Sequence, residues 1–121
     1  MSYDTNNIFA KVLRGEIPCN KIAENQHALA FYDINPQAPQ HALIIPKGAY
    51  QSFNEFAAMA TADEMSAWLA LIADVAKQLG LTDSGYRLLI NTGGDAAQEV
   101  PHLHAHIVGG HALGRMLATT A

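Results

Sequence analysis

Histidine alternates with apolar residues between positions 102 and 108, and this period of two constrains the fold of the chain more than any other feature. Successive side chains of a β-strand point to opposite faces of a sheet. A strand over 102–108 therefore places His102, His104 and His106 on one face, with same-face neighbours about 7 Å apart. That spacing lets several imidazoles contact one small anion, so the pattern predicts a histidine-rich sheet face that meets water or a ligand.

The remaining sequence predicts a mixed α and β domain around that strand. Apolar residues at helical spacing indicate a short helix over 8–13 and a long helix over 61–79. Thr61 and Glu64 form a capping-box pattern at the start of the long helix, and Gly80 ends it. Apolar runs bounded by turn residues predict the other strands. Two of them form a hairpin over 21–33 that turns at 25–27. A third is a buried run over 41–45, which follows the proline-containing loop 35–39. A fourth covers 86–90 and precedes the loop 91–100.

Composition places the chain among globular proteins of one domain and excludes several other classes. Its 121 residues are half hydrophobic and 15% charged, which favours one packed core over residues 1–121. Seven Lys and Arg residues in a chain of net charge −4 form no basic stripe, so long nucleic acid is not an expected partner. A lone cysteine, Cys19, makes no internal disulfide. No apolar run approaches the roughly 20 residues of a membrane span, and we expect a cytoplasmic protein with no membrane contact.

The histidine cluster suits chemistry on a phosphate group. An imidazole has an unperturbed pKa of about 6.5, and neighbouring imidazolium charges repel, so crowding favours neutral rings. A neutral imidazole can attack phosphorus once a hydrogen bond fixes its tautomer. Two other interpretations stay open: the histidines are only packed in the core, or two of them bind zinc together with His41 or the third. Because no obvious carboxylate or thiol lies beside the motif, we expect neither a metal nor a cofactor.

Three segments of the chain carry a resemblance to a known family, namely residues 32–39, residues 44–47 and the histidine alternation. In these segments the chain resembles the histidine triad (HIT) nucleotide-binding family, specifically bacterial proteins of its Hint branch, and the similarity extends from Ile8 to Gly110. The resemblance implies an α+β, HIT-like fold with an antiparallel sheet of about five strands, one short helix and one long helix. It also implies a homodimer in which the sheet continues from one protomer to the other.

The long helix gives a separate reason to expect a homodimer. Its apolar residues Trp68, Leu69 and Leu71 span more than one face, which is broad for a domain of this size. A two-fold interface would bury the apolar side chains of the helix that do not pack into the core of the domain.

By the resemblance, His104 attacks the α-phosphorus of a purine nucleoside monophosphate and forms a nucleotidyl-histidine that water later opens. His106 contacts the phosphate and the leaving group, His102 orients the nucleophile, and His41 lies behind it. Asp33 binds the ribose hydroxyls by accepting two hydrogen bonds. The other implied nucleotide-binding residues lie around the base, namely Ile8, Phe9, Val12, Phe31, Ile34 and Leu43, and against the phosphate, namely Asn91, Gln98 and Glu99.

The implied activity is hydrolysis or nucleotidyl transfer on a purine nucleotide conjugate of the phosphoramidate type, such as an AMP–amine conjugate. Two alternatives remain open: hydrolysis of a dinucleoside polyphosphate, and nucleotide binding by an interaction protein with vestigial activity. The chain departs from the family pattern at Ala97, where glycine is usual, at Pro101, where many relatives have tyrosine, and at His111, where arginine is common. Ala97 tightens the phosphate loop if that position needs a positive φ. We expect these departures to affect rate and specificity more than reaction class.

Overall fold

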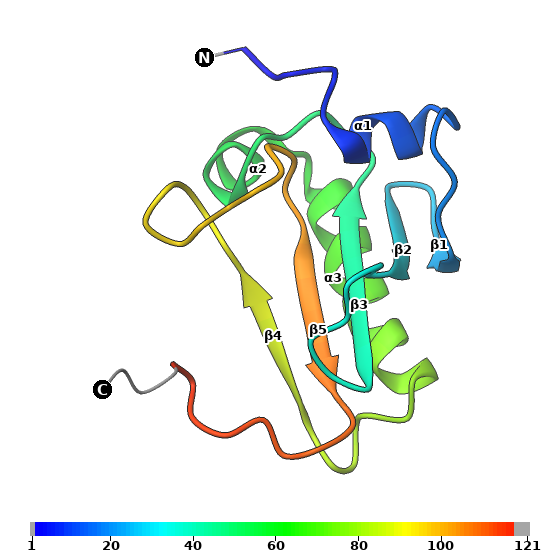
Figure 1. The fold of residues 1–121 in the computed structure, drawn as a ribbon. Coiled ribbons are helices and arrows are strands. Elements are labelled where there is room, and N and C mark those ends of the chain that lie inside the picture. The colour runs from blue at the N-terminus through cyan, green and yellow to red at the C-terminus, as the bar shows by residue number, and fades with distance from the viewer. Residues whose placement is uncertain (1, 118–121) are drawn as a thin grey trace.

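Five antiparallel strands form one open sheet, and the long helix α3 packs across one of its faces (Figure 1). The computed structural model describes residues 2–117. Along the chain the elements are α1 (Ile8–Leu13), β1 (Lys21–Glu24), β2 (Ala28–Tyr32), β3 (Gln40–Pro46), α2 (Phe53–Met59), α3 (Ala62–Gln78), β4 (Tyr86–Ile90) and β5 (Ala105–Gly109). The spatial order of the strands is β1-β2-β3-β5-β4. These elements confirm the predicted α+β fold with a five-stranded antiparallel sheet.

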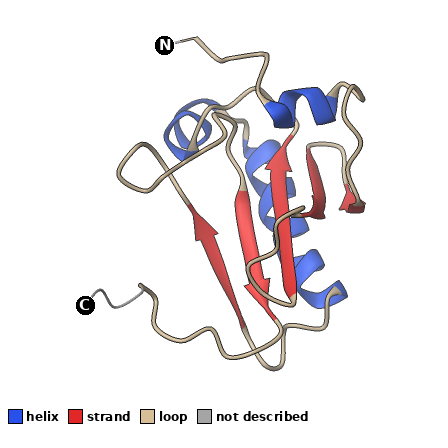
Figure 2. Cartoon of the chain, viewed as in Figure 1, coloured by secondary structure: helices blue, strands red, loops and turns tan. Residues whose placement is uncertain are grey.

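The short helices α1 and α2 lie near the end of the sheet where β3 ends and β5 begins (Figure 2). The two histidines closest to the start of β5, His104 and His106, therefore lie at the same end as α1. Within residues 2–117, no helix has the length and apolar character needed to cross a membrane.

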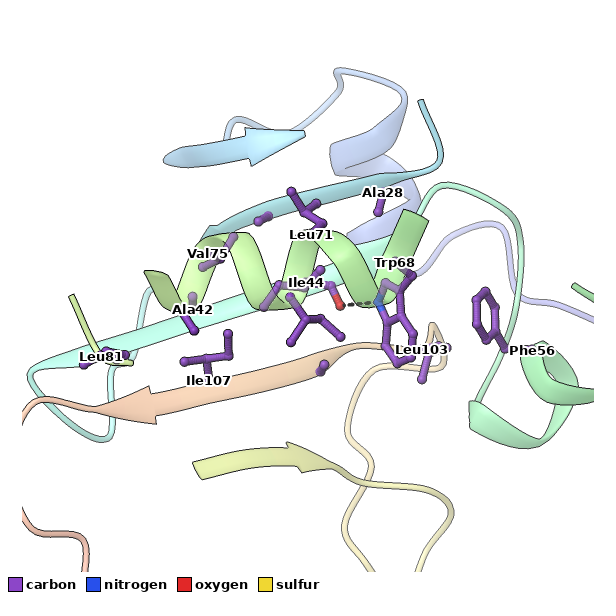
Figure 3. Close-up of a cluster of buried hydrophobic side chains, with 14 residues drawn as sticks. Ala28, Ala42, Ile44, Phe56, Trp68, Leu71, Val75, Leu81, Leu103 and Ile107 are labelled. Atoms are coloured by element: carbon purple, nitrogen blue, oxygen red, sulfur yellow. Dashed lines mark hydrogen bonds between the residues drawn. The ribbon is translucent and has the colours of Figure 1, made fainter. Parts of the chain in front are cut away.

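Strand β3 lies at the centre of the sheet and is buried on both faces, as its continuous apolar run predicts. Ala42 and Ile44 face α3, while Leu43 and Ile45 belong to a second apolar cluster on the opposite face. The Trp68 indole N–H on α3 donates a hydrogen bond to the carbonyl of Ile44 at 3.0 Å, which ties the helix to the middle of the sheet (Figure 3). The helix covers one face and leaves the other face to α1 and the candidate site.

The long helix begins where its capping signal predicts. The Thr61 hydroxyl accepts a hydrogen bond from the backbone N–H of Glu64 at 3.1 Å, and the Glu64 carboxylate accepts one from the N–H of Thr61 at 3.0 Å. Trp68 and Leu71 are buried in the core, whereas Leu69 keeps 58% of its surface exposed. The apolar residues of the helix therefore span more than one face, as the sequence indicates.

Strand β5 is shorter than the sequence predicts, because its pairing with both β3 and β4 begins at Ala105. Before that residue the backbone leaves the sheet: the N–H of Leu103 donates to the carbonyl of Tyr50 at 2.9 Å. The prediction of one strand that carries all three histidines is therefore wrong. His102 lies in a bend and His104 in the irregular segment before β5, and only His106 lies within the strand.

Helix α2 has no counterpart among the predicted elements. The Ser52 side chain caps it by accepting a hydrogen bond from the N–H of Asn54 at 3.2 Å. Phe56 is the one buried residue of the helix, and a single buried position in two turns produces no apolar period that a sequence pattern would reveal.

Candidate active site

A cavity of about 610 Å³ opens on the sheet face opposite α3, with α1 as one wall. Most of the predicted site residues line it, namely Ile8, Phe9, Val12, Phe31, Asp33, Ile34, His41, Leu43, Asn91, Glu99, His104 and His106. Two predicted residues, His102 and Gln98, do not line it. The lining also includes residues that the sequence did not single out, namely Ile17, Pro18, Cys19, Tyr32, Asn35, Gln37, Ala96 and Val100. Most of these come from loops, where no periodic pattern marks a residue as part of a site.

One end of the cavity is apolar. The rings of Phe9 and Phe31 pack edge to face with centroids 5.6 Å apart, and Leu43 belongs to the same cluster. Ile8 and Ile34 line the cavity while keeping 43% and 86% of their surfaces exposed. Exposed apolar side chains beside an aromatic pocket are suited to cover a flat ring such as a nucleobase.

His102 is fully buried, and its two ring nitrogens have different partners. Its Nε2 lies 2.8 Å from the carbonyl oxygen of Pro46, so Nε2 carries the proton and donates. Its Nδ1 is then unprotonated and accepts a hydrogen bond from the Tyr3 hydroxyl at 2.5 Å. Burial lowers the pKa of His102 to about 4, so the ring is neutral near pH 7. The prediction that His102 shares an open face with the other histidines is wrong, because both of its nitrogens are used inside the protein.

His104 is held in the opposite tautomer. Its Nδ1 lies 2.8 Å from the backbone carbonyl oxygen of His102, so Nδ1 carries the proton and Nε2 is left with a free lone pair. The Phe9 ring packs edge-on against the imidazole with centroids 5.0 Å apart. Burial lowers the pKa of His104, although the hydrogen bond to His102 and the charge of Asp33 act in the opposite direction. A neutral imidazole with a free lone pair is the form that attacks phosphorus.

His41 and His106 form a directed pair. The backbone N–H of Gln37 donates to Nδ1 of His41 at 3.0 Å, so the proton of His41 lies on Nε2. That Nε2–H donates to Nδ1 of His106 at 2.9 Å, which places the proton of His106 on its own Nε2. Among the described residues this buried Nε2 has no hydrogen-bond partner, although His106 lines the cavity. A buried donor left without a partner indicates a place for a ligand acceptor such as a phosphate oxygen.

The electrostatics of the pair also favour neutral rings. Burial lowers the pKa of His106 to about 4, and the nearby rings of His104 and His41 act in the same direction. Burial likewise lowers the pKa of His41, opposed by the charge of Asp33. The cavity therefore presents a lone pair at His104 and an N–H donor at His106, and their ring centroids lie 5.0 Å apart.

A carboxylate does lie beside the histidines, contrary to the impression from the local sequence. Asp33, His41 and His106 place one possible ligand atom each within 4.8 Å of one another. However, the Nε2 of His41 and the Nδ1 of His106 are only 2.9 Å apart, which is a hydrogen-bond distance. Two nitrogens on a tetrahedral zinc ion lie about 3.3 Å apart, so a metal there would have to break the directed pair.

Asp33 uses its two carboxylate oxygens differently. Oδ1 accepts a hydrogen bond from the backbone N–H of Asn35 at 2.7 Å and holds the turn after β2. Oδ2 lies 3.5 Å from Nε2 of His41. The carboxylate is mostly buried and lines the cavity together with His41 and His106.

The loop before the histidines is fixed by Gln98, which was predicted to lie against the phosphate. Its Nε2 donates to the carbonyls of Gln51 at 2.8 Å and Val100 at 3.0 Å, and its Oε1 accepts from the N–H of Gly93 at 3.1 Å. Because these bonds use the side-chain amide, Gln98 shapes the loop and does not line the cavity. The preceding Ala97 has a φ of 57°, the one positive φ of a residue other than glycine within residues 2–117.

Comparison with known proteins gives consistent results along the chain. A family model described as HIT domain matches residues 14–113. An uncharacterized 13.2 kDa HIT-like protein from Azospirillum brasilense is 54% identical over 116 residues, which cover 96% of this chain and 95% of the relative. The purine nucleoside phosphoramidase of Escherichia coli K12 is 40% identical over 111 residues, which cover 92% of each chain.

Solved structures show the same arrangement of elements. A HIT family hydrolase from Clostridium thermocellum is similar, with a TM-score of 0.86 and 37% identity over 93% of this chain and 97% of that one. A HIT family hydrolase from Legionella pneumophila gives a TM-score of 0.80 with 38% identity over 90% of this chain and 96% of that one.

Proposed function

Because the chain belongs to the HIT domain family, we propose that it hydrolyses, or transfers the nucleotidyl group of, a purine nucleoside phosphoramidate by cleaving the bond between the α-phosphorus and an amine nitrogen. The observation that carries the proposal is the opposite protonation of two neighbouring rings. His104 offers an unprotonated Nε2, and His106 offers an Nε2–H without a partner among the described residues. A phosphoryl group needs both, a nucleophile for phosphorus and a donor for its oxygens. The purine nucleoside phosphoramidase relative supports the choice of substrate.

In the first step, Nε2 of His104 attacks the α-phosphorus and the bond from phosphorus to nitrogen breaks. When that nitrogen has taken one proton from solvent, the amine leaves as a neutral molecule. The Nε2–H of His106 donates to a phosphoryl oxygen and stabilises the negative charge in the transition state. His104 is then a nucleotidyl-imidazolium, whose Nδ1–H still donates to the carbonyl of His102.

In the second step, water attacks phosphorus and the electron pair of the phosphorus–nitrogen bond returns to Nε2 of His104. The products are the nucleoside monophosphate, the free neutral imidazole and one proton, which balances the proton taken up in the first step. Asp33 and the apolar end of the cavity hold the ribose and the base through both steps. Splitting one displacement into two lowers the barrier of each.

A substrate panel tests the proposal. Purified protein should release amine from an adenosine phosphoramidate, guanosine phosphoramidate or both, and should act much more slowly on a diadenosine polyphosphate. Faster turnover of the polyphosphate would replace the proposed reaction by polyphosphate hydrolysis. Nucleotide binding without turnover of either would make the chain a binding protein.

Treatment with a chelator tests whether the reaction needs a metal ion. We expect activity to be unchanged after dialysis against a chelator, because the tautomers of the four histidines follow from protein hydrogen bonds alone. An enzyme that loses activity on chelation and regains it with zinc would contradict this prediction and favour a metal at Asp33, His41 and His106.

A further inference from the structure

A second hollow, of about 350 Å³, adjoins the first on the side of β4. The two hollows share Gln37, His41, Asn91 and His106. The rest of the second hollow is lined by Arg87, Leu89, Val108 and Leu113. His106 therefore lies at the boundary between the two spaces.

The strand register explains which residues line the second hollow. In the ladder of β4 and β5, Leu89 lies opposite His106 and Arg87 lies opposite Val108. These four side chains lie on one face of the sheet, since same-face positions alternate along each strand. The apolar pocket and Asp33 lie on the other side of His106, toward β2 and α1. From the first hollow, the space beyond His106 therefore continues toward Arg87.

Arg87 places a positive charge beside the apolar side chains of Leu89, Val108 and Leu113, which line the same part of the second hollow. Its Nη2 donates to the carbonyl of Gly114 at 2.7 Å, which fixes the guanidinium against the segment after β5. Over the part of the chain that the structure describes, no carboxylate forms an ion pair with it. A guanidinium held by one neutral contact keeps further N–H donors for an anion, and its planar fork fits a carboxylate.

We propose that the second hollow is a leaving-group subsite, in which Arg87 selects amines that carry a carboxylate. This inference rests on the proposed function, because it assigns the amine of that reaction. The nitrogen bonded to phosphorus would lie near His106, the carbon chain of the amine would pack on Leu89 and Leu113, and its carboxylate would pair with Arg87. No chemical step is added: the amine leaves as before, with its carboxylate still held.

Two substrates built on one amino acid test the subsite. One is the adenosine phosphoramidate of an amino acid with a free carboxylate, and the other is the same compound with the carboxylate as a methyl ester. We expect the wild-type protein to favour the free carboxylate roughly tenfold in kcat/KM, the size of effect typical of one charge-assisted contact. The ester provides the baseline for each variant, so a general loss of activity does not change the ratio.

The decisive variant is Arg87→Gln, which removes the charge and keeps a polar side chain, although the shorter amide does not reach as far as the guanidinium Nη2 that contacts Gly114. Its ratio should fall to about one, while Arg87→Lys should retain part of the preference. Arg115→Gln is the matched control, because Arg115 is exposed and lines neither hollow, and it should keep the wild-type ratio.

An equal rate for both substrates in the wild type, or an unchanged ratio in Arg87→Gln, would overturn the subsite. If Arg87→Gln does not fold, the wild-type ratio and the Arg87→Lys ratio decide. Absence of turnover of both substrates would overturn the proposed function itself, and this outcome is distinct from turnover without preference.

Discussion

His104 and His111 are the same residue type in very different surroundings. His104 is buried beside Phe9 with one nitrogen fixed by a carbonyl, whereas His111 is exposed after β5. We expect His104→Ala to lower kcat by several orders of magnitude, as loss of a nucleophile does in other covalent enzymes, with little change in nucleotide affinity. The apolar pocket and Asp33 remain in this variant, which is why binding and turnover should separate.

Turnover kinetics and nucleotide titration of His104→Ala measure the two effects, and His27→Ala, at a histidine that lines neither hollow, serves as the matched control with near wild-type values. Acid-quenched wild-type protein should also carry a nucleotidyl mass on the peptide that contains His104. Near-normal turnover of His104→Ala would assign the nucleophile to another histidine.

The buried histidines should make the stability of the protein depend on pH. The pKa values of His102 and His106 are about 4 in the folded protein, against about 6.5 in an unfolded chain. Between these values the unfolded chain binds more protons than the folded one. Their contribution to stability is therefore complete above pH 6.5 and is lost as the pH falls toward 4. Each group changes the free energy of unfolding by at most about 1.4 kcal/mol per pH unit.

Denaturant unfolding at pH 7.5, 6 and 5 measures this slope. The matched variant His111→Gln, which changes an exposed histidine, should show the same slope as the wild type. A free energy of unfolding that stays constant from pH 6.5 to 5 would mean that the folded protein accepts protons on these rings as readily as the unfolded chain.

Ala97 stores strain in the loop that faces the cavity. Its φ of 57° is a left-handed conformation that favours glycine, because the Cβ atom crowds the following carbonyl. Ala97→Gly should therefore raise the free energy of unfolding by about 1 kcal/mol, after allowance for the greater freedom of glycine in the unfolded chain. Ala96→Gly is the control, since Ala96 has no positive φ and its replacement should lower stability. Equal effects of the two substitutions would show that the loop relaxes around Ala97.

At the scale of elements, the segment before α1 reaches the histidines through one side chain. The Tyr3 hydroxyl donates to Nδ1 of His102, which is fully buried. Tyr3→Phe leaves that nitrogen without its partner and should cost about 1 to 3 kcal/mol of stability. Tyr86→Phe is the control, because Tyr86 is exposed on β4 and should change stability little. Thermal unfolding of both variants checks this, and a stable Tyr3→Phe would mean that water replaces the hydroxyl.

The elements differ in how much of them the sequence could predict. Helix α3 carries a capping box and a long apolar period, and β3 carries a continuous apolar run, so both have the predicted positions. The predicted start of β5 at His102 is wrong, because β5 pairs with β3 and β4 only from Ala105 onward. The extent of pairing depends on where β3 and β4 lie, which the alternation of residues does not reveal. Helix α2 buries one residue and carries no period.

The candidate site shows the same division. The triad histidines could be identified from the sequence because their residue type and spacing are unusual, whereas the apolar pocket residues were implied only by the resemblance to the HIT family. The protonation pattern of the histidines could not be predicted, because it depends on partners far along the chain: Tyr3 and Pro46 for His102, and His41 for His106. Such pairings arise only when segments far apart in the sequence come together in the folded chain.

At the scale of the molecule, the two edge strands of the sheet differ in how readily each could pair with a strand of another protomer. The outer strand β1 carries exposed charges and an irregular register at Lys21, which oppose further pairing. The other outer strand, β4, keeps a regular register, its one charged side chain, Arg87, is held at the carbonyl of Gly114, and its Leu88 is 44% exposed. We therefore expect a homodimer in which β4 of each protomer extends the other sheet. Light scattering at micromolar concentration should give twice 13.0 kDa.

Leu88→Glu should convert that dimer to monomers, because it places like charges across the two-fold pairing. Leu69→Glu, on the exposed side of α3, tests the other apolar surface. A dimer that survives Leu88→Glu and is lost in Leu69→Glu would place the interface on the helix instead of the sheet edge.

The proton positions of three histidines are fixed by main-chain atoms: the carbonyl of Pro46 for His102, the carbonyl of His102 for His104 and the N–H of Gln37 for His41. A main-chain anchor survives most changes of the side chain at the residue that supplies it. Substitutions at position 37 or 46 can therefore accumulate without changing which nitrogen of each ring reacts, provided that no proline removes the N–H of residue 37. An insertion of one residue within β3 would instead shift the carbonyl of Pro46 by one position relative to His41, so that the two would no longer serve the same face of the sheet. The protonation pattern of His41 and His102 therefore tolerates substitution at positions 37 and 46 but not a change in the spacing of β3.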